Sequence, residues 1–223
     1  MSFIVAVDGP AGSGKGTITK KIEKELGLIN LDTGATYRCV ALEALRNGYS
    51  VNEEEKIIKL IDDMNIEIEN KGEKDKIYLN GEDVSEEIRK MEVTKIVSEI
   101  SSIIPVREKL VLLQRKMTEG KDVIVEGRDI GTVVFPNADL KIYLDASVEV
   151  RAKRRYKENL EKNIESNYEE VLENIRKRDE IDKNRKVGAL RKAKDAILVD
   201  SSNLTIDEVT KKIKDLIEEK RRI

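Results

Sequence analysis

The sequence predicts an α/β fold in which a five-stranded parallel sheet is flanked by helices. Three observations support this prediction. Five short apolar runs have the length and aliphatic content of buried strands, helical patterns separate them, and a glycine-rich loop joins the first run to the first helix. In such a fold, ligands bind beside the carboxyl ends of the strands, so the residues there are the first candidates for a functional site.

The predicted elements alternate along the chain. The expected strands are short and apolar, and they cover residues 3–8, 28–31, 122–126, 140–144 and 196–199. The expected helices carry apolar residues at helical spacing, and they cover residues 15–26, 36–46, 53–64, 93–103, 106–119, 148–161, 168–183 and 206–219. Local signals mark several helix ends, among them Thr205 with Glu208, which form a capping-box pattern.

One region departs from this alternation. Polar and apolar residues follow each other with a period of two between residues 65 and 85, and Asn80-Gly81 is typical of a two-residue hairpin turn. Two interpretations remain open: an inserted substrate-side subdomain at about residues 65–88, or a decorated loop. Apart from this region, we expect residues 1–223 to form a single domain, because the chain is long enough for one substantial core.

The loop of residues 9–17 predicts a phosphate site. Gly9, four residues, then Gly14-Lys15 is the P-loop spacing, in which backbone amides surround a β-phosphate and the lysine reaches the terminal phosphates. The following helix N-terminus adds a partial positive charge. A turn that only links strand to helix is disfavoured by this context. The expected phosphate-binding residues are Gly9, Pro10, Ala11, Gly12, Ser13, Gly14, Lys15, Gly16 and Thr17. The sheet is therefore expected to be of the P-loop NTPase type.

The residues at the end of this loop indicate which class of P-loop protein the sequence resembles. In the commonest P-loop, Ser or Thr follows the lysine directly, whereas here Gly16 separates Lys15 from Thr17. The variant resembles the loop of nucleoside monophosphate kinases and differs from that of GTP switch proteins.

Composition excludes several functions. The net charge of -2 and the 39% content of charged residues give no general attraction to nucleic acid or to an anionic membrane. No apolar stretch approaches the roughly 20 residues that span a bilayer, and no signal-like segment precedes the first strand, so we expect a cytoplasmic protein without a membrane partner. Cys39 is the only cysteine, which excludes intramolecular disulfides and cysteine-based metal clusters.

The absence of histidine constrains the chemistry. It removes His-dependent triads, histidine metal sites and the ordinary proton shuttle near neutral pH. A phosphate acceptor suits this limit, because its second pKa near 6 leaves it largely ionised at pH 7. A nucleotide is therefore favoured over a sugar or an alcohol as the second substrate.

A second anion site is expected after the second strand. Residues 32–38 open a helix there, and Thr33 with Arg38 are candidates for an acceptor phosphate. A capped helix with an incidental arginine explains this segment equally well when it is considered alone.

The third strand ends in Glu126-Gly127-Arg128-Asp129. Arg128 is expected to bridge the transferring and acceptor phosphates, and Asp129 to accept a hydrogen bond from the acceptor. Glu126 occupies a Walker-B-like position from which a carboxylate reaches Mg²⁺ directly or through water. A structural salt bridge of Arg128 is the alternative, and the clustering of these residues at strand ends disfavours it.

Arginines also gather in the last third of the chain. A mobile segment that closes over the transferring group lowers the barrier and excludes water. We therefore interpret about residues 151–187 as a lid, with a pair of ordinary charged helices as the alternative. Its arginines are Arg151, Arg154, Arg155, Arg176, Arg178 and Arg185.

These motifs together resemble the bacterial cytidylate kinase (CMP kinase) family. The resemblance rests on GPAGSGKGT, LDTGATYR, VREKL, EGRDIGTVVFP, LKIYLDAS and KRDEIDKNR, and runs from residue 3 to about 200. It implies transfer of the γ-phosphate of ATP to CMP and dCMP with Mg²⁺. It also implies a core parallel sheet, a lid and an inserted nucleoside-monophosphate-binding subdomain.

The resemblance implies a role for each matching residue. At the acceptor phosphate it puts Thr33, Arg38, Arg128 and Arg178, at the ribose Asp182, and at cytosine Ser98, Arg107 and Asp129. Lys15, Arg128, Arg178 and Arg155 are the expected catalytic residues, Arg151 joins the loop in binding ATP, and Thr17 and Glu126 are the expected metal ligands. A carboxylate is a natural acceptor for the amino group of cytosine, so UMP should be rejected.

Two positions differ from the family pattern. Thr33 stands where serine is common and keeps the hydroxyl, and Ile181 stands at a lid position that is arginine in some relatives.

The rival functions are a P-loop kinase for another acceptor, such as UMP, AMP or shikimate, and a nucleotide-gated RNA-binding protein. The acidic net charge and the 4% aromatic content speak against RNA. We expect a monomer whose partners are small nucleotides, without nucleic acid.

Overall fold

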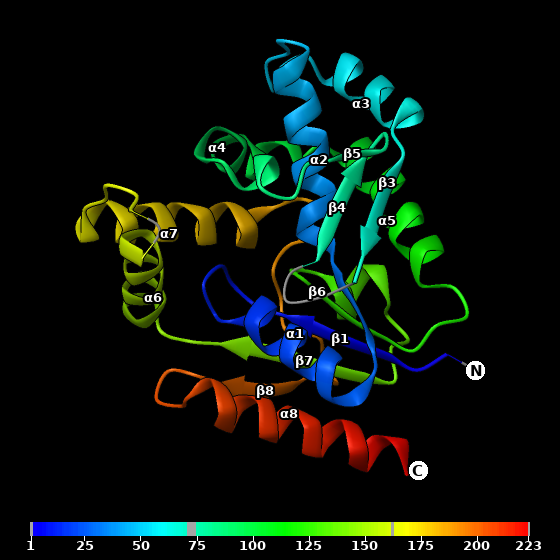
Figure 1. The fold of residues 1–223 in the computed structure, drawn as a ribbon, viewed down its shortest axis with the longest axis vertical. Coiled ribbons are helices and arrows are strands. Elements are labelled where there is room, and N and C mark those ends of the chain that lie inside the picture. Colours follow the sequence, from blue (N-terminus) through cyan, green and yellow to red (C-terminus); the bar gives the residue numbers. More distant parts are fainter. Residues whose placement is uncertain (1, 71–74, 162, 223) are drawn as a thin grey trace. The chain divides into compact units, whose positions relative to one another are not determined.

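The computed structural model describes residues 2–70, 75–161 and 163–222 (Figure 1). The chain divides into two compact units. The first comprises Met1–Asn30 and Lys121–Ile223, and the second comprises Leu31–Gly120.

A five-stranded parallel sheet organises the first unit. Its strands are β1 (Ile4–Asp8), β2 (Ile29–Asp32), β6 (Val123–Gly127), β7 (Leu140–Asp145) and β8 (Ile197–Asp200), in the order β2-β6-β1-β7-β8. β1 pairs in parallel with β6 and β7, and β7 with β8. The predicted fold class is confirmed, and each strand begins within one residue of its expected start. The central position of β1 explains its unbroken apolar run, since both faces of a parallel sheet are covered.

Helices α1 (Lys15–Leu26) and α8 (Ile206–Arg221) pack on the sheet. Their apolar faces meet the strands in one core, whose buried members include Val5, Val7, Ile18, Ile22, Ile124, Ile142, Val209 and Ile213. The predicted capping box is confirmed: the Glu208 amide donates to the Thr205 hydroxyl at 3.2 Å, and the Thr205 amide donates to the Glu208 carboxylate at 2.8 Å.

The remaining helices of this unit are α6 (Val148–Glu161) and α7 (Tyr168–Asn184). They pack on each other through a small core of their own, which buries Ala152, Val171, Leu172 and Ile175. The rings of Tyr156 and Tyr168 meet edge to face, with centroids 6.1 Å apart. Asn167 caps α7 by accepting the Glu169 amide at 2.8 Å.

The second unit holds helices α2 (Thr33–Arg46), α3 (Glu54–Asp63), α4 (Met91–Ile100) and α5 (Ile104–Thr118). The expected start of α2 at residue 36 is wrong, because the helix begins at Thr33. The Thr36 hydroxyl donates to the Thr33 carbonyl at 2.8 Å in this first turn. Gly34 also permits the turn, since a Cβ there would lie 2.9 Å from the Asp32 carboxylate. Cys39 is fully buried in this helix, as expected of a packing residue.

A three-stranded antiparallel sheet also belongs to this unit. Its strands are β3 (Ile66–Glu69), β4 (Lys76–Leu79) and β5 (Glu82–Asp83), in that order. Asn80 and Gly81 join β4 to β5 with φ of 52° and 84°, the backbone that a two-residue hairpin turn requires. The alternating pattern therefore predicted these strands correctly. Residues 71–74 of the expected insertion lie outside the described residues, and its boundaries and substrate role stay a prediction.

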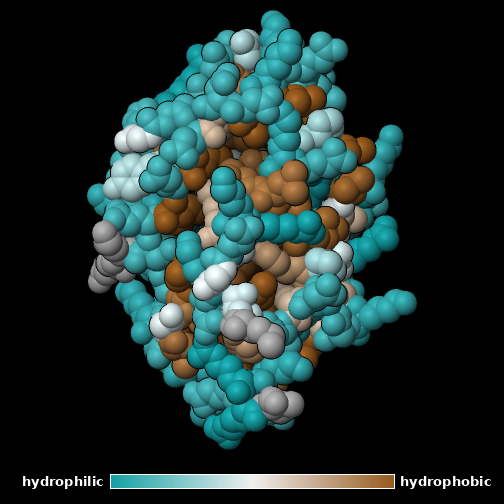
Figure 2. All heavy atoms as spheres, turned by 90° about the vertical axis from the view of Figure 1, so that its right-hand side faces the viewer, coloured by the Kyte–Doolittle hydropathy of each residue, from teal (hydrophilic) through white to brown (hydrophobic). Residues whose placement is uncertain are grey.

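The face shown in Figure 2 is mainly hydrophilic. Hydrophilic side chains cover much of the face shown in Figure 2, with hydrophobic ones between them. None of the helices among the described residues is both long enough and apolar enough to traverse a bilayer.

Candidate active site

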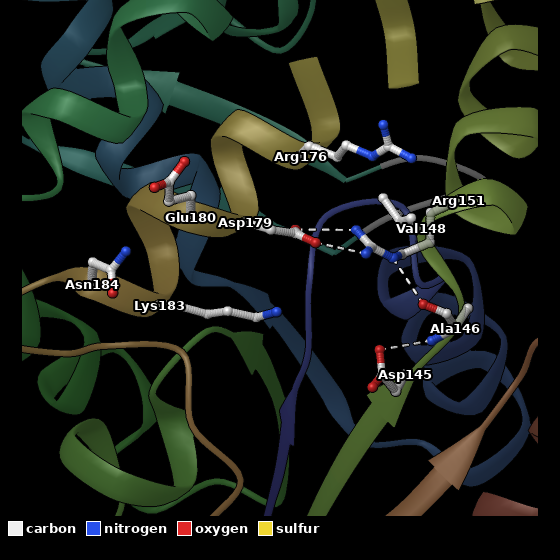
Figure 3. A pocket seen from close by; sticks show the side chains of 9 residues that line it. All are labelled: Asp145, Ala146, Val148, Arg151, Arg176, Asp179, Glu180, Lys183 and Asn184. Carbon is white, nitrogen blue, oxygen red and sulfur yellow. Dashed lines mark hydrogen bonds and ion pairs between the residues drawn. The ribbon is translucent and has the colours of Figure 1, made fainter. Parts of the chain in front are cut away.

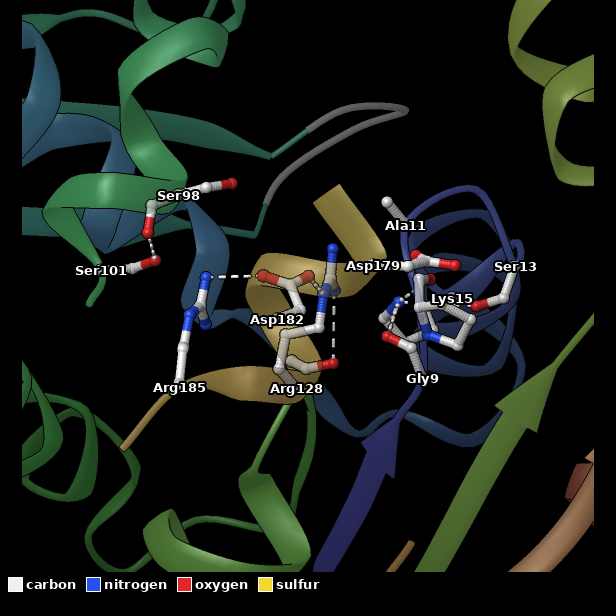
Figure 4. A network of polar contacts seen from close by, with 12 residues as sticks. Gly9, Ala11, Ser13, Lys15, Ser98, Ser101, Arg128, Asp179, Asp182 and Arg185 are labelled. Carbon is white, nitrogen blue, oxygen red and sulfur yellow. Dashed lines mark hydrogen bonds and ion pairs between the residues drawn. The ribbon is translucent and has the colours of Figure 1, made fainter. Parts of the chain in front are cut away.

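The glycine-rich loop folds back on its own lysine. The Lys15 ammonium donates to the carbonyls of Gly9 at 2.8 Å and Pro10 at 2.9 Å (Figure 4). Its side chain is buried. Burial lowers the pKa of Lys15, the nearby Arg128 lowers it further, and Glu126 and Asp8 oppose the shift.

Glycine is required at two loop positions in particular. A Cβ on Gly9 would lie 2.0 Å from the Leu144 carbonyl oxygen, closer than any side chain can approach. Gly14 has a φ of 96°, in the left-handed region, and it is the cap from which α1 starts. The loop therefore passes directly over the end of β7 and delivers its amides to the helix N-terminus, the geometry of a phosphate-binding loop.

Thr17 and Glu126 provide oxygen atoms at the start of α1. The Glu126 carboxylate lies 3.2 Å from where a Gly16 Cβ would stand, and it accepts a hydrogen bond from the Thr19 hydroxyl at 3.4 Å. Glu126 is buried, while Thr17 is exposed. Hydroxyl and carboxylate oxygens are ligands that Mg²⁺ prefers, so these residues fit the expected ion. Within the described residues no group of three or more acidic, cysteine or histidine side chains is placed to hold a metal, so a bound ion would also need phosphate oxygens.

Arg128 and Arg185 meet on one carboxylate. Arg128 Nε donates to Asp182 Oδ2 at 2.8 Å, and Arg185 Nη2 donates to Asp182 Oδ1 at 2.6 Å (Figure 4). Burial alone would raise the pKa of Asp182, but the charges of Arg128, Arg185 and Arg178 outweigh it and hold that pKa below its ordinary value. The structure thus brings Arg128 and Arg178 close enough to Lys15 to lower its pKa, and the same two arginines close to Asp182.

Arg151 connects helices α6 and α7 to the phosphate-binding loop. It donates to both oxygens of Asp179, at 3.1 and 2.6 Å, and to the carbonyls of Ala11 at 3.1 Å and Ala146 at 2.9 Å. Arg151 and Asp179 are both buried. An open pocket of about 540 Å³ lies beside this pair (Figure 3). It is lined by Asp145, Ala146, Val148, Arg151, Arg176, Asp179, Glu180, Lys183 and Asn184.

The other predicted lid arginines differ in their surroundings. Arg154 donates to the Ser201 carbonyl at 2.7 Å and to the Ser13 carbonyl at 3.4 Å, so it braces the loop from outside. Arg155 pairs with Glu158 on the same helix at 3.0 Å. Arg176 is more than half exposed and lies 3.7 Å from Glu149.

Asp8 is a residue that sequence reasoning missed. It ends β1 directly before the loop and is buried. Its two carboxylate oxygens accept hydrogen bonds from the amides of Ile130 at 2.7 Å and Gly131 at 2.8 Å. Burial raises the pKa of Asp8 to about 6. The available signal was an acidic residue in an otherwise apolar strand, which indicates a satisfied buried carboxylate.

In the second unit, two of the predicted cytosine-binding residues lie close together. Arg107 Nη1 donates to the Ser101 carbonyl at 3.0 Å, and the Ser101 hydroxyl donates to the Ser98 carbonyl at 3.0 Å. The Arg107 guanidinium stacks 5.4 Å from the centre of the Tyr37 ring. All four residues are buried, and Ser101 and Tyr37 are the two that the sequence did not single out as site residues.

Arg38 and Thr33 lie one and a half turns apart on α2. Arg38 Nη1 donates to the Thr94 hydroxyl at 2.9 Å and to the Ile88 carbonyl at 3.3 Å. The Thr36 hydroxyl accepts from the buried Gln114 side chain at 2.9 Å while it donates to Thr33. These bonds fix the first turn of α2 and the direction of Arg38.

The site has a phosphate-binding loop, a carboxylate beside the helix that follows this loop, and arginines at the ends of strands of a parallel sheet. Together these features define a P-loop kinase. A family model described as cytidylate kinase matches residues 5–219. The chain belongs to the cytidylate kinase family, so the resemblance seen in its motifs is confirmed.

Individual relatives agree with this assignment. A cytidylate kinase from Clostridium acetobutylicum is 48% identical over 99% of this chain and 100% of its own length. Cytidylate kinases from Fusobacterium nucleatum and Caldicellulosiruptor bescii are 48% and 45% identical, over 97% and 95% of this chain and 98% and 94% of theirs. A crystal structure of an uncharacterized protein from Eubacterium ventriosum aligns over 97% of this chain and 99% of that one, with a TM-score of 0.54 at 12% identity, and shows the fold alone.

Proposed function

We propose that this chain transfers the γ-phosphate of ATP to CMP or dCMP and releases ADP and CDP or dCDP. The observation that carries the proposal is the match to cytidylate kinases over nearly the whole chain, which includes the phosphate-binding loop and the Glu126–Asp129 segment. The transfer is direct and in line, without a covalent intermediate.

On the donor side, the loop amides and Lys15 bind the β- and γ-phosphates. The buried Lys15 ammonium gives up two carbonyl hydrogen bonds, to Gly9 and Pro10, in exchange for phosphate oxygens. Thr17 and Glu126 are the residues that would hold Mg²⁺, which would neutralise negative charge on the phosphates. Arg151 keeps the loop carbonyl of Ala11 in place.

On the acceptor side, positive charge replaces a catalytic base. The acceptor phosphate is already largely ionised at neutral pH, so no side chain has to remove a proton from it. Arg128 and Arg178 neutralise the charge of the transferring group, and the bond from Arg128 to Asp182 holds the guanidinium in one orientation before the acceptor arrives. Arg155 is proposed to join them when the lid closes.

Selectivity for cytosine is proposed to depend on hydrogen-bond polarity. Asp129 accepts from the exocyclic amino group, and Ser98 and Arg107 bind the rest of the base edge. Uracil offers an oxygen at the amino position, which would repel the carboxylate and leave it unpaired. Thr33 and Arg38 bind the acceptor phosphate, and Asp182 the ribose hydroxyls.

Helices α6 and α7 are proposed to act as the lid. They share a small core that does not include the sheet, which supports movement of the pair as one body. Arg151 pairs with Asp179 of α7 and also donates to the Ala11 carbonyl of the phosphate-binding loop, so binding of ATP to the loop is proposed to affect α7 through Arg151.

A substrate panel tests the function. Purified protein with MgATP is offered CMP, dCMP, UMP, AMP and shikimate in turn, and ADP formation is followed. We expect rapid turnover with CMP and dCMP, and a kcat/KM for UMP lower by about 100-fold or more, as expected for an unpaired buried acceptor. Equal turnover of UMP or AMP would contradict the proposed base recognition. Sedimentation in the same buffer tests the expected monomer.

A further inference from the structure

Asp8 contacts the residues on both sides of the Arg128-Asp129 dipeptide. Through its backbone it is the register partner of Gly127 in the parallel pair of β1 and β6. Through its side chain it accepts the amides of Ile130 and Gly131, at 2.7 and 2.8 Å. The two residues between these contacts are therefore held at either end by one residue of the central strand.

The amides that Asp8 binds have no partner within their own helical turn. Ile130–Val134 is a single π-helical turn, and its first amides point out of the turn, as at any helix start. The Val133 amide donates back to the Asp129 carbonyl at 2.8 Å, so the turn also fixes Asp129 from its C-terminal side. The position of this turn thus depends on the Asp8 carboxylate.

Packing keeps the turn against that carboxylate. A Cβ on Gly131 would lie 3.1 Å from the Lys141 side chain and 3.3 Å from Asp8 Oδ2, so a larger residue would require these side chains to shift. Lys141 is itself fixed by the Pro136 carbonyl at 2.6 Å and by Asp195 at 2.8 Å. The contact between Asp8 and the turn leaves little freedom on either side.

The buried surroundings of Asp8 do not by themselves favour a charged side chain. Burial raises the pKa of Asp8 to about 6, so at pH 7 the side chain is ionised although its surroundings favour the neutral form. A carboxylate is, however, the one side chain of this size that accepts two amides with two equivalent oxygens.

We propose that Asp8 is a positioning residue that sets Arg128 and Asp129 relative to the phosphate-binding loop. Asp8 immediately precedes Gly9, so the strand that starts the loop also carries the contact that locates the acceptor-side residues. Asp8 touches neither substrate and acts through Arg128 and Asp129. This inference rests on the proposed function, because the proposed function assigns Arg128 and Asp129 to the acceptor.

The first test is Asp8→Asn, assayed with MgATP and CMP. The carboxamide keeps the shape but offers one accepting oxygen, so one buried amide faces an NH₂ group. We expect kcat with CMP to fall by about 10- to 100-fold, the loss that one unsatisfied buried donor entails. We also expect the KM for MgATP to change by less than about threefold, because the loop amides keep their positions and Asp8 is only one of several charges that act on Lys15. A structural defect alone would not produce this difference between kcat and the KM for MgATP.

Asp139→Asn is the matched control. Asp139 is exposed and accepts the amide of Ile4 at 2.8 Å, which is the same type of contact at the opposite end of β1. We expect its kcat to stay within about twofold of the parent, as for a surface substitution.

Gly131→Ala disturbs the same contact without removing charge, and it decides the question if Asp8→Asn does not fold. We expect a smaller loss of kcat for CMP, with the KM for MgATP again unchanged. The proposal is overturned if the folded variants keep kcat within twofold, or if the KM for MgATP rises as far as kcat falls. A parent protein that does not phosphorylate CMP would contradict the proposed function instead, a result that is seen before any variant is made.

Discussion

Arg128 Nε lies 2.8 Å from the carboxylate of Asp182, a residue 54 positions later in the chain. The same carboxylate accepts Arg185 at 2.6 Å, so one buried negative charge serves two arginines. This arrangement holds Arg128 at the end of β6 and ties α7 to the sheet. The free-energy cost of burying the Asp182 charge and the stabilisation from its ion pairs are both electrostatic. Both can be measured.

Asp182→Asn should therefore destabilise the fold in a pH-dependent way. Removing one partner of a buried ionic cluster costs about 3 kcal/mol at pH 7. Because the pKa of Asp182 is lower in the folded than in the unfolded chain, its stabilising contribution is complete above its unfolded pKa. That contribution is lost as the pH falls through the folded pKa. Urea unfolding of both proteins between pH 7 and pH 3 should show a difference that shrinks with acid, and a constant difference would contradict it.

Lys15→Ala should abolish turnover and leave the fold intact. The lysine stabilises the charge of the terminal phosphates, and loss of such a group typically lowers kcat by about a factor of 1,000. Its own partners are loop carbonyls that water can hydrate in the variant. Lys24→Ala, an exposed lysine of the same helix, is the control. Near-normal activity of Lys15→Ala, with a melting temperature like that of the parent, would exclude the lysine from the mechanism.

Asp129→Ala should relax the preference for CMP over UMP. The proposed hydrogen bond from the cytosine amino group disappears, and so does the repulsion of uracil. We expect the ratio of kcat/KM values for the two substrates to fall by about 10- to 100-fold, the discrimination that one such contact provides. Steady-state kinetics with both nucleotides measures this ratio. An unchanged ratio would show that Asp129 does not bind the base.

Arg151→Lys should weaken both stability and ATP binding. Lysine keeps the charge but cannot bind both oxygens of Asp179 and two carbonyls at once. We expect a loss of about 2 kcal/mol in the free energy of unfolding and a higher KM for MgATP. Arg176→Lys is the control, since its exposed pair with Glu149 at 3.7 Å contributes little. Equal effects of the two substitutions would argue against the role of Arg151 in bracing the loop.

The elements were predictable because their signals are local. The loop before α1, the capping box at Thr205 and the Asn80-Gly81 turn each depend on a few neighbouring residues. The start of α2 was predicted three residues late, because the Thr36–Thr33 bond and the close approach of Gly34 to Asp32 are not evident from apolar spacing.

The contacts that organise the candidate site were not predictable in this way. Asp8 binds amides more than 120 positions away, and the pattern around Arg128 favoured a phosphate partner over a salt bridge. In the structure, Arg128 has the salt bridge with Asp182. Local patterns indicate candidate residues, whereas the partner of each depends on sheet order and helix docking, which no short stretch of sequence records.

The separate core of α6 and α7 has a consequence for local unfolding. Four buried side chains and one pair of tyrosine rings hold the two helices together, so this hairpin has fewer apolar contacts to lose than the sheet does. Amide hydrogens of α7 should exchange with deuterated solvent well before those of β1, through openings that leave the strands paired. Addition of ATP should slow α7 selectively, because the ligand would favour the docked hairpin. The hairpin would then report nucleotide occupancy through its own exchange rate, independently of catalysis.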